Sequence, residues 1–272
     1  MATVPKHLVC FDNIDEWAPA LSEVLLPLAP ADIQRELKAA ATEYIEDARD
    51  YFLRFADRKS VIDAMLHWIR STSIAGYHGT RLTDAEVESI KSKGLIPLRA
   101  TARRERIERA LSRHPRWKEV ANRLDEAIHS VGPGCAVGSR EGQVYLTLSR
   151  AGLTEGFNHY LTHGAEFDWH VALKLLGDEG KELLSTDGTS YVIEVAVPGA
   201  TALATAHPFY GVEDMRARGE LPNILNEFLC AWCFRQSRPR YQSRKLRVDC
   251  GMMFRSTVPP EWIRQFDVWK CG

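Results

Sequence analysis

A change in hydrophobic pattern near residue 70 constrains the fold most strongly. From about residue 14 to residue 70, apolar side chains recur with the spacing of an α-helix, as Ile33, Leu37 and Ile45 do in the segment 31–56. Asn13 stands where the N-cap of the first helix is expected. These segments hold no evident catalytic cluster, so we predict an all-helical N-terminal subdomain over residues 1–70.

Beyond residue 70 the pattern becomes mixed. "IAGYHGT" (74–80) predicts a short strand that ends in a glycine turn, and a capping box of Thr83 and Glu86 opens a helix that ends at Gly94. Residues 101–130 and 157–177 are typical of helices. Strands are predicted at 143–149, 189–198, 227–234 and 247–254. We therefore expect an α+β fold, with a second domain over residues 71–272.

Composition excludes several classes of protein. The net charge is −1, so any binding to nucleic acid has to come from a local patch. No apolar run reaches the roughly 20 residues of a membrane span, and the first residues lack the pattern of a secretory signal. The six cysteines are scattered and do not indicate a disulfide framework. We expect a cytoplasmic protein without a membrane partner, or one delivered into a target cell without a readable signal.

Three short strings carry candidate chemistry when they are taken together. They are "YHGT" (77–80), "GQVYLTLS" (142–149), with Tyr160 in the helix that follows, and "ILNEFLCAWCF" (224–234). A lone histidine or a strand tyrosine is usually structural. Glu227 is unusual, because it opens an apolar run in which an unpaired carboxylate is costly. The order His, Tyr, Glu, each expected at a strand boundary, is informative.

In this order of motifs the chain resembles the His-Tyr-Glu branch of the ADP-ribosyltransferase superfamily, which includes diphtheria-toxin-like enzymes and poly(ADP-ribose) polymerases. The matching strings are "HGT", "GQVYLT" with Tyr160, and "NEF", so the resemblance covers about residues 72–270. It implies a split, mostly antiparallel β-sandwich as the catalytic core. It also implies that NAD is the substrate and that no metal is required.

The resemblance implies specific roles for the "HGT" residues and the two tyrosines. His78 would bond a ribose hydroxyl of NAD, and the Gly79 backbone would pair with the nicotinamide amide, beside Thr80 of the same motif. Tyr145 and Tyr160 would stack on the two faces of the nicotinamide ring.

The resemblance also implies the catalytic acid. Glu227 would hold the 2'-hydroxyl of the nicotinamide ribose and stabilise the positive charge that develops as the glycosidic bond breaks. His78, Glu227 and Tyr145 are thus the predicted catalytic residues.

The sequence departs from the family pattern in two places. His78 and Tyr145 stand farther apart along the chain than in polymerase relatives, and a basic helical segment fills the gap. Phe157 occupies the position, three residues before Tyr160, where such relatives carry a serine. We therefore expect transfer of a single ADP-ribose unit to a protein or nucleic-acid acceptor. Two alternatives stay open: an NAD glycohydrolase of toxin or defence type, and a non-catalytic module that binds a nucleotide or a partner.

Other clusters favour structural roles. Cys230 and Cys233 are expected on a strand, where their side chains would face opposite ways and not share a metal. His159 and His163 lie one helical turn apart, but without a metalloprotease motif. The basic segments 99–118 and 235–247 are interpreted first as solvated surface. If either borders the active site, the second is the better candidate for the NAD pyrophosphate or an anionic acceptor, since it follows Glu227 directly.

Overall fold

The computed structural model describes residues 7–131, 142–156, 158–206, 211–218, 220–245 and 251–270. The chain divides into two compact units, each assembled from three segments. Unit 1 comprises residues 1–76, 147–156 and 196–252, and unit 2 comprises residues 77–146, 157–195 and 253–272. The α+β class is confirmed. Over the described ranges, each helix is too short or too polar to cross a lipid bilayer.

Among the described residues, six strands form one open sheet: five run in the order β5-β3-β2-β4-β6, and β1 pairs with β2. β1 and β2 are parallel, whereas β4 and β6 are antiparallel, with Ile193 opposite Phe266. The predicted strands at 143–149 and 189–198 are confirmed, and the strand expected at 247–254 is present over its described part. The six strands are β1 (Leu8–Val9), β2 (Ser73–Leu82), β3 (Val144–Thr147), β4 (Thr189–Pro198), β5 (Gly251–Phe254) and β6 (Ile263–Val268).

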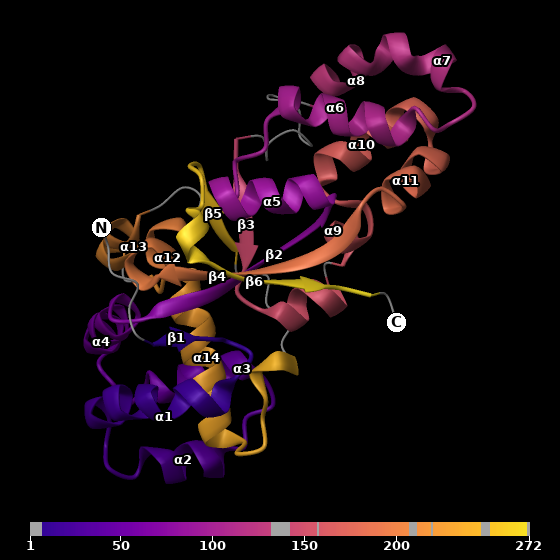
Figure 1. The fold of residues 1–272 in the computed structure, drawn as a ribbon. Coiled ribbons are helices and arrows are strands. Elements are labelled where there is room, and N and C mark those ends of the chain that lie inside the picture. The colour runs from indigo at the N-terminus through magenta and orange to yellow at the C-terminus, as the bar shows by residue number, and fades with distance from the viewer. Residues whose placement is uncertain are drawn as a thin grey trace. The chain divides into compact units, whose positions relative to one another are not determined.

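Unit 1 is mainly helical. The helices predicted between residues 14 and 70 are present, but α14, from far along the chain, runs among them (Figure 1) and packs on α1, α2, α3 and α4. The compact unit is therefore larger than the predicted subdomain of residues 1–70. Its helices are α1 (Ile14–Leu25), α2 (Ile33–Ala40), α3 (Ile45–Phe52), α4 (Arg58–Arg70), α12 (Gly199–Thr205), α13 (Val212–Ala217) and α14 (Asn223–Ser237).

Helix α14 overturns one prediction, since residues 227–234 are helical and not a strand. The Phe228 ring meets the rings of Phe11, Trp17 and Trp68 at 5.3, 4.9 and 5.4 Å, all edge to face. Neighbouring residues are buried too, because other helices of unit 1 surround α14. The middle of the helix, residues 228–233, is buried on every side and reads as an unbroken apolar run, which lacks the period that identifies a surface helix.

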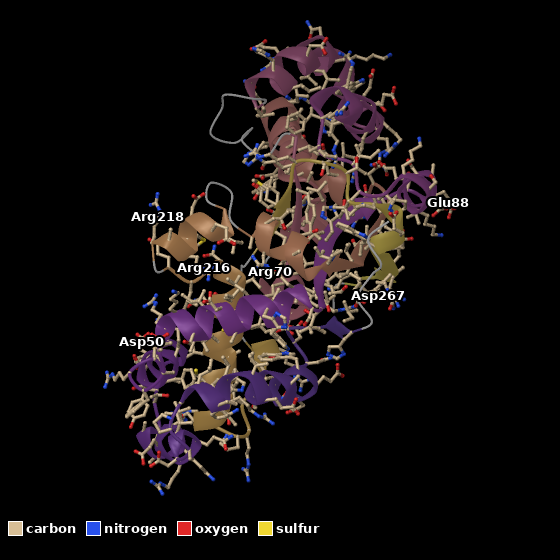
Figure 2. The ribbon with its side chains drawn as sticks, turned by 90° about the vertical axis from the view of Figure 1, so that its left-hand side faces the viewer. Asp50, Arg70, Glu88, Arg216, Arg218 and Asp267 are labelled. Carbon is tan, nitrogen blue, oxygen red and sulfur yellow. The ribbon has the colours of Figure 1, made fainter. Side chains whose placement is uncertain are left out.

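Polar contacts join several segments of unit 1. The Asp12 carboxylate accepts hydrogen bonds from Ser149 Oγ (2.7 Å) and from the backbone N–H groups of Arg150 (2.8 Å) and Ala151 (3.1 Å). On the surface, α13 is joined to α4 by Arg216–Asp63 and Arg70–Glu213 pairs, with N···O distances of 2.6 and 3.3 Å; the two arginines are labelled in Figure 2.

A close backbone approach fixes the start of α12. The Gly199 N–H donates to the Thr72 carbonyl at 2.9 Å. A β-carbon at Gly199 would lie 1.7 Å from the Ile69 carbonyl oxygen. Only glycine fits this position without moving the backbone.

Unit 2 holds most of the sheet and a separate helical core. Helices α6, α8, α10 and α11 pack around a shared apolar cluster that includes Ile107, Leu124, Val171 and Leu184 (Figure 1). The helices predicted at 101–130 and 157–177 are confirmed, the second in two pieces that break at Gly164. The helices are α5 (Asp84–Lys93), α6 (Ala100–Leu111), α7 (Trp117–Val120), α8 (Leu124–Ser130), α9 (His159–His163), α10 (Glu166–Leu176) and α11 (Asp178–Ser185).

The "GYHGT" segment forms no turn. β2 continues through it to Leu82, and neither Gly76 nor Gly79 has a left-handed backbone. The glycine turn predicted here is therefore wrong: these glycines lie within an extended strand. The helix signals that follow are confirmed, since Thr83 and Glu86 form the capping box and the backbone turns at Gly94, φ 81°.

Candidate active site

His78 and Tyr145 are brought together on adjacent strands of unit 2. The His78 side chain from β2 lies with its Nδ1 2.9 Å from the Tyr145 carbonyl oxygen in β3. A carbonyl oxygen only accepts hydrogen bonds, so Nδ1 must carry a proton and donate it. In β2, Gly79 is half-buried and Thr80 is buried beside the histidine.

The surroundings of His78 keep its ring neutral. Burial lowers the pKa of His78 below its ordinary value, and the positive charge of Arg103 acts in the same direction, against the hydrogen bond to Tyr145. With the proton on Nδ1, the Nε2 atom of a neutral ring is a hydrogen-bond acceptor. The ring is therefore suited to accept a bond from a hydroxyl group, such as that of a sugar.

The two predicted stacking tyrosines both lie in unit 2. The Tyr145 hydroxyl donates to Gln143 Oε1 at 2.6 Å and lies 3.3 Å from the Met253 sulfur. Tyr160 is in α9, with its ring centre 4.1 Å from that of His159. The Ser190 hydroxyl in β4 donates to the carbonyl of Leu161, the residue after Tyr160, at 2.6 Å, and this bond ties α9 to the sheet. Stacking of both tyrosines on one ring stays a prediction, and Phe157 lies outside the described residues.

Glu227 belongs to unit 1. It lies half-buried in the first half of α14 and not at the mouth of a strand, so the structural context predicted for it is wrong. Burial raises the pKa of the Glu227 carboxyl, and the charge of Glu46 adds to that effect, while Asn226 and Arg49 oppose it. Its catalytic role stays a prediction.

A polar hollow lies beside Asn226 in unit 1. It has a volume of about 370 Å³. Arg49, at its wall, donates from Nη1 to Asn226 Oδ1 at 2.6 Å and lies 3.7 Å from the Cys230 sulfur. The hollow is lined by Arg49, Asp50, Arg58, Met215, Glu220, Leu221, Asn223 and Asn226.

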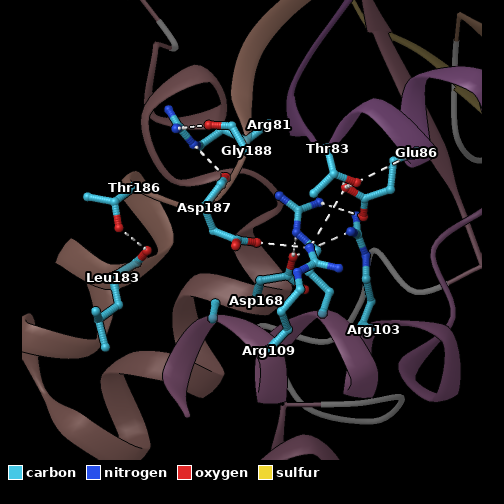
Figure 3. Close-up of polar contacts among 12 residues, drawn as sticks. Arg81, Thr83, Glu86, Arg103, Arg109, Asp168, Leu183, Thr186, Asp187 and Gly188 are labelled. Atoms are coloured by element: carbon cyan, nitrogen blue, oxygen red, sulfur yellow. Dashed lines mark hydrogen bonds and ion pairs between the residues drawn. The ribbon is translucent and has the colours of Figure 1, made fainter. Parts of the chain in front are cut away.

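The first basic segment contains a feature that sequence reasoning missed. Arg103 and Arg106, one turn apart on α6, both pair with Asp168 of α10; Arg103 and Asp168 are labelled in Figure 3. Arg103 Nη1 and Arg106 Nε lie 3.4 and 3.6 Å from Asp168 Oδ2. The Asp168 side chain is 0% exposed and that of Arg106 only 4%. The interpretation of this segment as a solvated helix face is therefore wrong for these residues.

Two further arginines complete this group, which we call the arginine cluster: Arg81, Arg103, Arg106 and Arg109. Arg109 Nη2 lies 2.9 Å from Asp187 Oδ2. Arg81 donates to Ser190 Oγ at 2.7 Å, to the Asp187 carbonyl at 3.1 Å and to the Gly188 carbonyl (Figure 3). One feature of the sequence could have indicated where these arginines lie: Arg103 and Arg106 are spaced like the apolar residues of α6 and so lie on its buried face.

The second basic segment holds structural contacts in unit 1 over its described part. Arg235 pairs with Asp15, and Arg238 donates to the Thr42 carbonyl at 2.9 Å. Residues 246 and 247 and the side chain of Lys245 lie outside the described residues. These contacts do not indicate an anion site.

The cysteines and histidines form no metal cluster within the described residues: no three His, Cys, Asp or Glu side chains are grouped to hold an ion. Cys230 and Cys233 share a helix, so the strand argument used to separate them is wrong. Both are buried, and burial raises the pKa of Cys230 to about 12 and that of Cys233 well above its ordinary value. Both thiols are therefore unreactive at neutral pH.

In comparisons with protein-family models, with curated proteins and with solved structures, no match to this chain was found. The resemblance to ADP-ribosyltransferases therefore rests on the sequence motifs.

Proposed function

We propose that the chain is an NAD-dependent mono-ADP-ribosyltransferase, with the NAD site on β2 and β3 of unit 2. The observation that supports this most is the 2.9 Å contact of His78 Nδ1 with the Tyr145 carbonyl oxygen, which requires a proton on Nδ1. It leaves Nε2 as an acceptor for a ribose hydroxyl, which is the role that the "HGT" motif implies. The proposal includes the family's split β-sandwich core, for which the α+β class is the present support.

In the proposed reaction, the bond between the nicotinamide nitrogen and ribose C1' breaks and nicotinamide leaves with the bonding electrons. The sugar carbon gains positive charge, and a nucleophile of the acceptor then bonds to C1' and loses its proton. His78 and Gly79 would position the ribose and the amide, and Tyr145 and Tyr160 would hold the ring. Glu227 is proposed as the carboxylate that stabilises the developing charge.

One observation favours a second candidate, a nucleotide-binding module without catalysis. Glu227 lies in a helix of unit 1, whereas the family places this acid at a strand, and His78 and Tyr145 belong to unit 2. A binding module would use the His78 and Tyr145 strands in the same way and would not depend on Glu227.

The test is nicotinamide release from NAD by the full-length protein, followed by chromatography. We expect release by the unaltered protein, loss of it in His78→Ala, and a decrease of about 100-fold or more in Glu227→Gln. The matched control is Glu46→Gln, which removes a carboxylate whose charge acts on Glu227; it should retain activity.

The remaining outcomes separate the alternatives. Release of nicotinamide with free ADP-ribose as the sole second product indicates a glycohydrolase, and label from NAD on a protein or nucleic acid indicates a transferase. Calorimetric binding of NAD that depends on His78, without any release, indicates the binding module. Absence of both binding and release would refute the NAD site.

A further inference from the structure

The arginine cluster holds more positive than negative charge. Three of its guanidinium groups, together with that of Arg113, pair with only three carboxylates, those of Glu86, Asp168 and Asp187. The fourth, Arg81, is bound to the Ser190 hydroxyl and to backbone carbonyls. Burial and the charge of Arg106 lower the pKa of Arg81, and burial also lowers that of Arg103. Cations that crowd together in this way form a site that favours an anion.

Arg103 and Arg109 are partly exposed members of the cluster, at 21% and 45%, but Arg109 is already hydrogen-bonded to Asp187 at 2.9 Å, whereas Arg103 makes the longer contact to Asp168. Asp168, the partner of Arg103 at 3.4 Å, is fully buried. The Arg103 guanidinium thus has a carboxylate on its buried side and solvent on the other. Arg81 and Arg109, by contrast, are hydrogen-bonded to Gly188, Ser190 or Asp187.

The contacts between Arg103, Arg106 and Asp168 are long for ion pairs. Neither Asp168 oxygen has a hydrogen-bond partner, and the same holds for Nε and Nη1 of Arg106. Buried charges without hydrogen bonds are costly. Such a cost is typical of a site arranged for a ligand and not of a pair selected for stability.

The backbone places Arg103 near His78. Leu98, just before α6, exchanges hydrogen bonds with the residues that lead into β3: its N–H donates to Gln143 O (3.3 Å) and its carbonyl accepts from Gly142 N–H (2.6 Å). Two residues further along is Tyr145, whose carbonyl binds the His78 ring. Arg103 lies in the first turn of α6, and its charge acts on His78.

We infer that Arg103 binds a diphosphate oxygen of the nucleotide whose ribose His78 holds, with buried Asp168 orienting the guanidinium. This inference rests on the proposed nucleotide site at His78. A guanidinium fork matches two oxygens of one phosphate group, which gives a strong, charge-assisted contact. The assignment differs from the one predicted from sequence, which favoured the segment 235–247 for the pyrophosphate.

The test compares Arg103→Gln with Arg104→Gln by calorimetry against three probes: ADP-ribose, adenosine and inorganic pyrophosphate. Arg104 is the matched control, since it is the next residue on α6, exposed, and paired with exposed Asp125. We expect Arg103→Gln to weaken binding of ADP-ribose and pyrophosphate by about tenfold or more. Binding of adenosine should be unchanged, and Arg104→Gln should match the unaltered protein.

Loss of the Arg103 charge leaves Asp168 less compensated, so each variant is also melted. If Arg103→Gln is unstable, Arg103→Lys keeps a positive charge beside Asp168 but lacks the guanidinium fork; it should fold and bind ADP-ribose more weakly than the unaltered protein. Unchanged affinity for ADP-ribose in a folded Arg103 variant overturns the inference. It does so even if the same variant binds a single-stranded oligonucleotide more weakly, because Arg103 would then serve a different anion.

Failure of the proposed function can be distinguished from failure of the inference about Arg103. If the unaltered protein binds pyrophosphate through Arg103 but neither NAD nor ADP-ribose, the anion site stands without the nucleotide, and both the assignment to a nucleotide and the proposed function are wrong. If NAD binding depends on His78 and is indifferent to Arg103, the proposed function stands and the inference fails.

Discussion

Gly199→Ala is expected to destabilise unit 1 severely. The added methyl group would lie 1.7 Å from the Ile69 carbonyl oxygen and 2.9 Å from that of Thr72, and neither is a flexible side-chain end. Relief of the first contact requires the start of α12 to move away from α4 by more than about 1 Å, since contacts below roughly 3 Å are essentially not observed. That movement would break the hydrogen bond from Gly199 N–H to Thr72.

The expected loss of stability has two parts, the steric overlap and the broken hydrogen bond. Overpacking of a dense interior costs about 1–3 kcal/mol, and leaving a buried backbone donor and acceptor unpaired costs about 1–3 kcal/mol. We therefore expect a loss of about 2–6 kcal/mol in the free energy of unfolding. At roughly 2–4 °C per kcal/mol for a chain of this size, the melting temperature should fall by about 4–24 °C.

The assay is urea and thermal unfolding followed by circular dichroism, with Gly211→Ala as the matched control. Gly211 also precedes a helix of unit 1, but its φ is −70° and an added β-carbon would lie 3.4 Å from Asp214 Oδ2, a contact that small shifts relieve. This control should lie within about 0.5 kcal/mol of the unaltered protein. Equal stability of the two variants would refute the steric argument.

Three further predictions follow from buried polar groups. Asp12→Ala should lower the urea-unfolding free energy by about 2–4 kcal/mol, because it deprives three donors of a charged acceptor; an unchanged midpoint would contradict this. Glu227→Gln should raise stability at pH 7, because the raised pKa means that the folded state disfavours the charged carboxyl, and this gain should vanish near pH 4. The pKa values of His78 and His163 are lowered in the folded state, so below about pH 6.5 the unfolded state binds more protons than the folded state. The free energy of unfolding should therefore fall from pH 7 to pH 5. His78→Gln should make this pH dependence flatter.

Much of the secondary structure could be predicted because its signals are local. Helices with one apolar face, such as α2 and α4, show the helical period, and the Thr83–Glu86 capping box marks the start of α5. Helix α14 could not be recognised, because its middle, residues 228–233, is buried on every side and no polar residue breaks the apolar run there. The predicted turn at "GYHGT" failed because glycine also occurs inside strands, where backbones approach closely.

The candidate site was partly predictable. The order of the motifs brought His78 and Tyr145 together, as adjacent strands do in the structure. The pairing of Arg103 with Asp168 joins helices that are distant in sequence, and nothing local marks Asp168 as the buried partner of a cation. The division of the chain into units also depends on distant contacts, which residue spacing does not report.

The late position of α14 has a consequence for synthesis on the ribosome. The partners of its aromatic side chains, Trp17, Phe52 and Trp68, all leave the ribosome before residue 223 is added. Until then the nascent N-terminal helices expose apolar faces that have no cover, a state in which chains aggregate. We expect nascent chains that stop before α14 to be bound by chaperones or degraded, and release to follow only when that helix has docked.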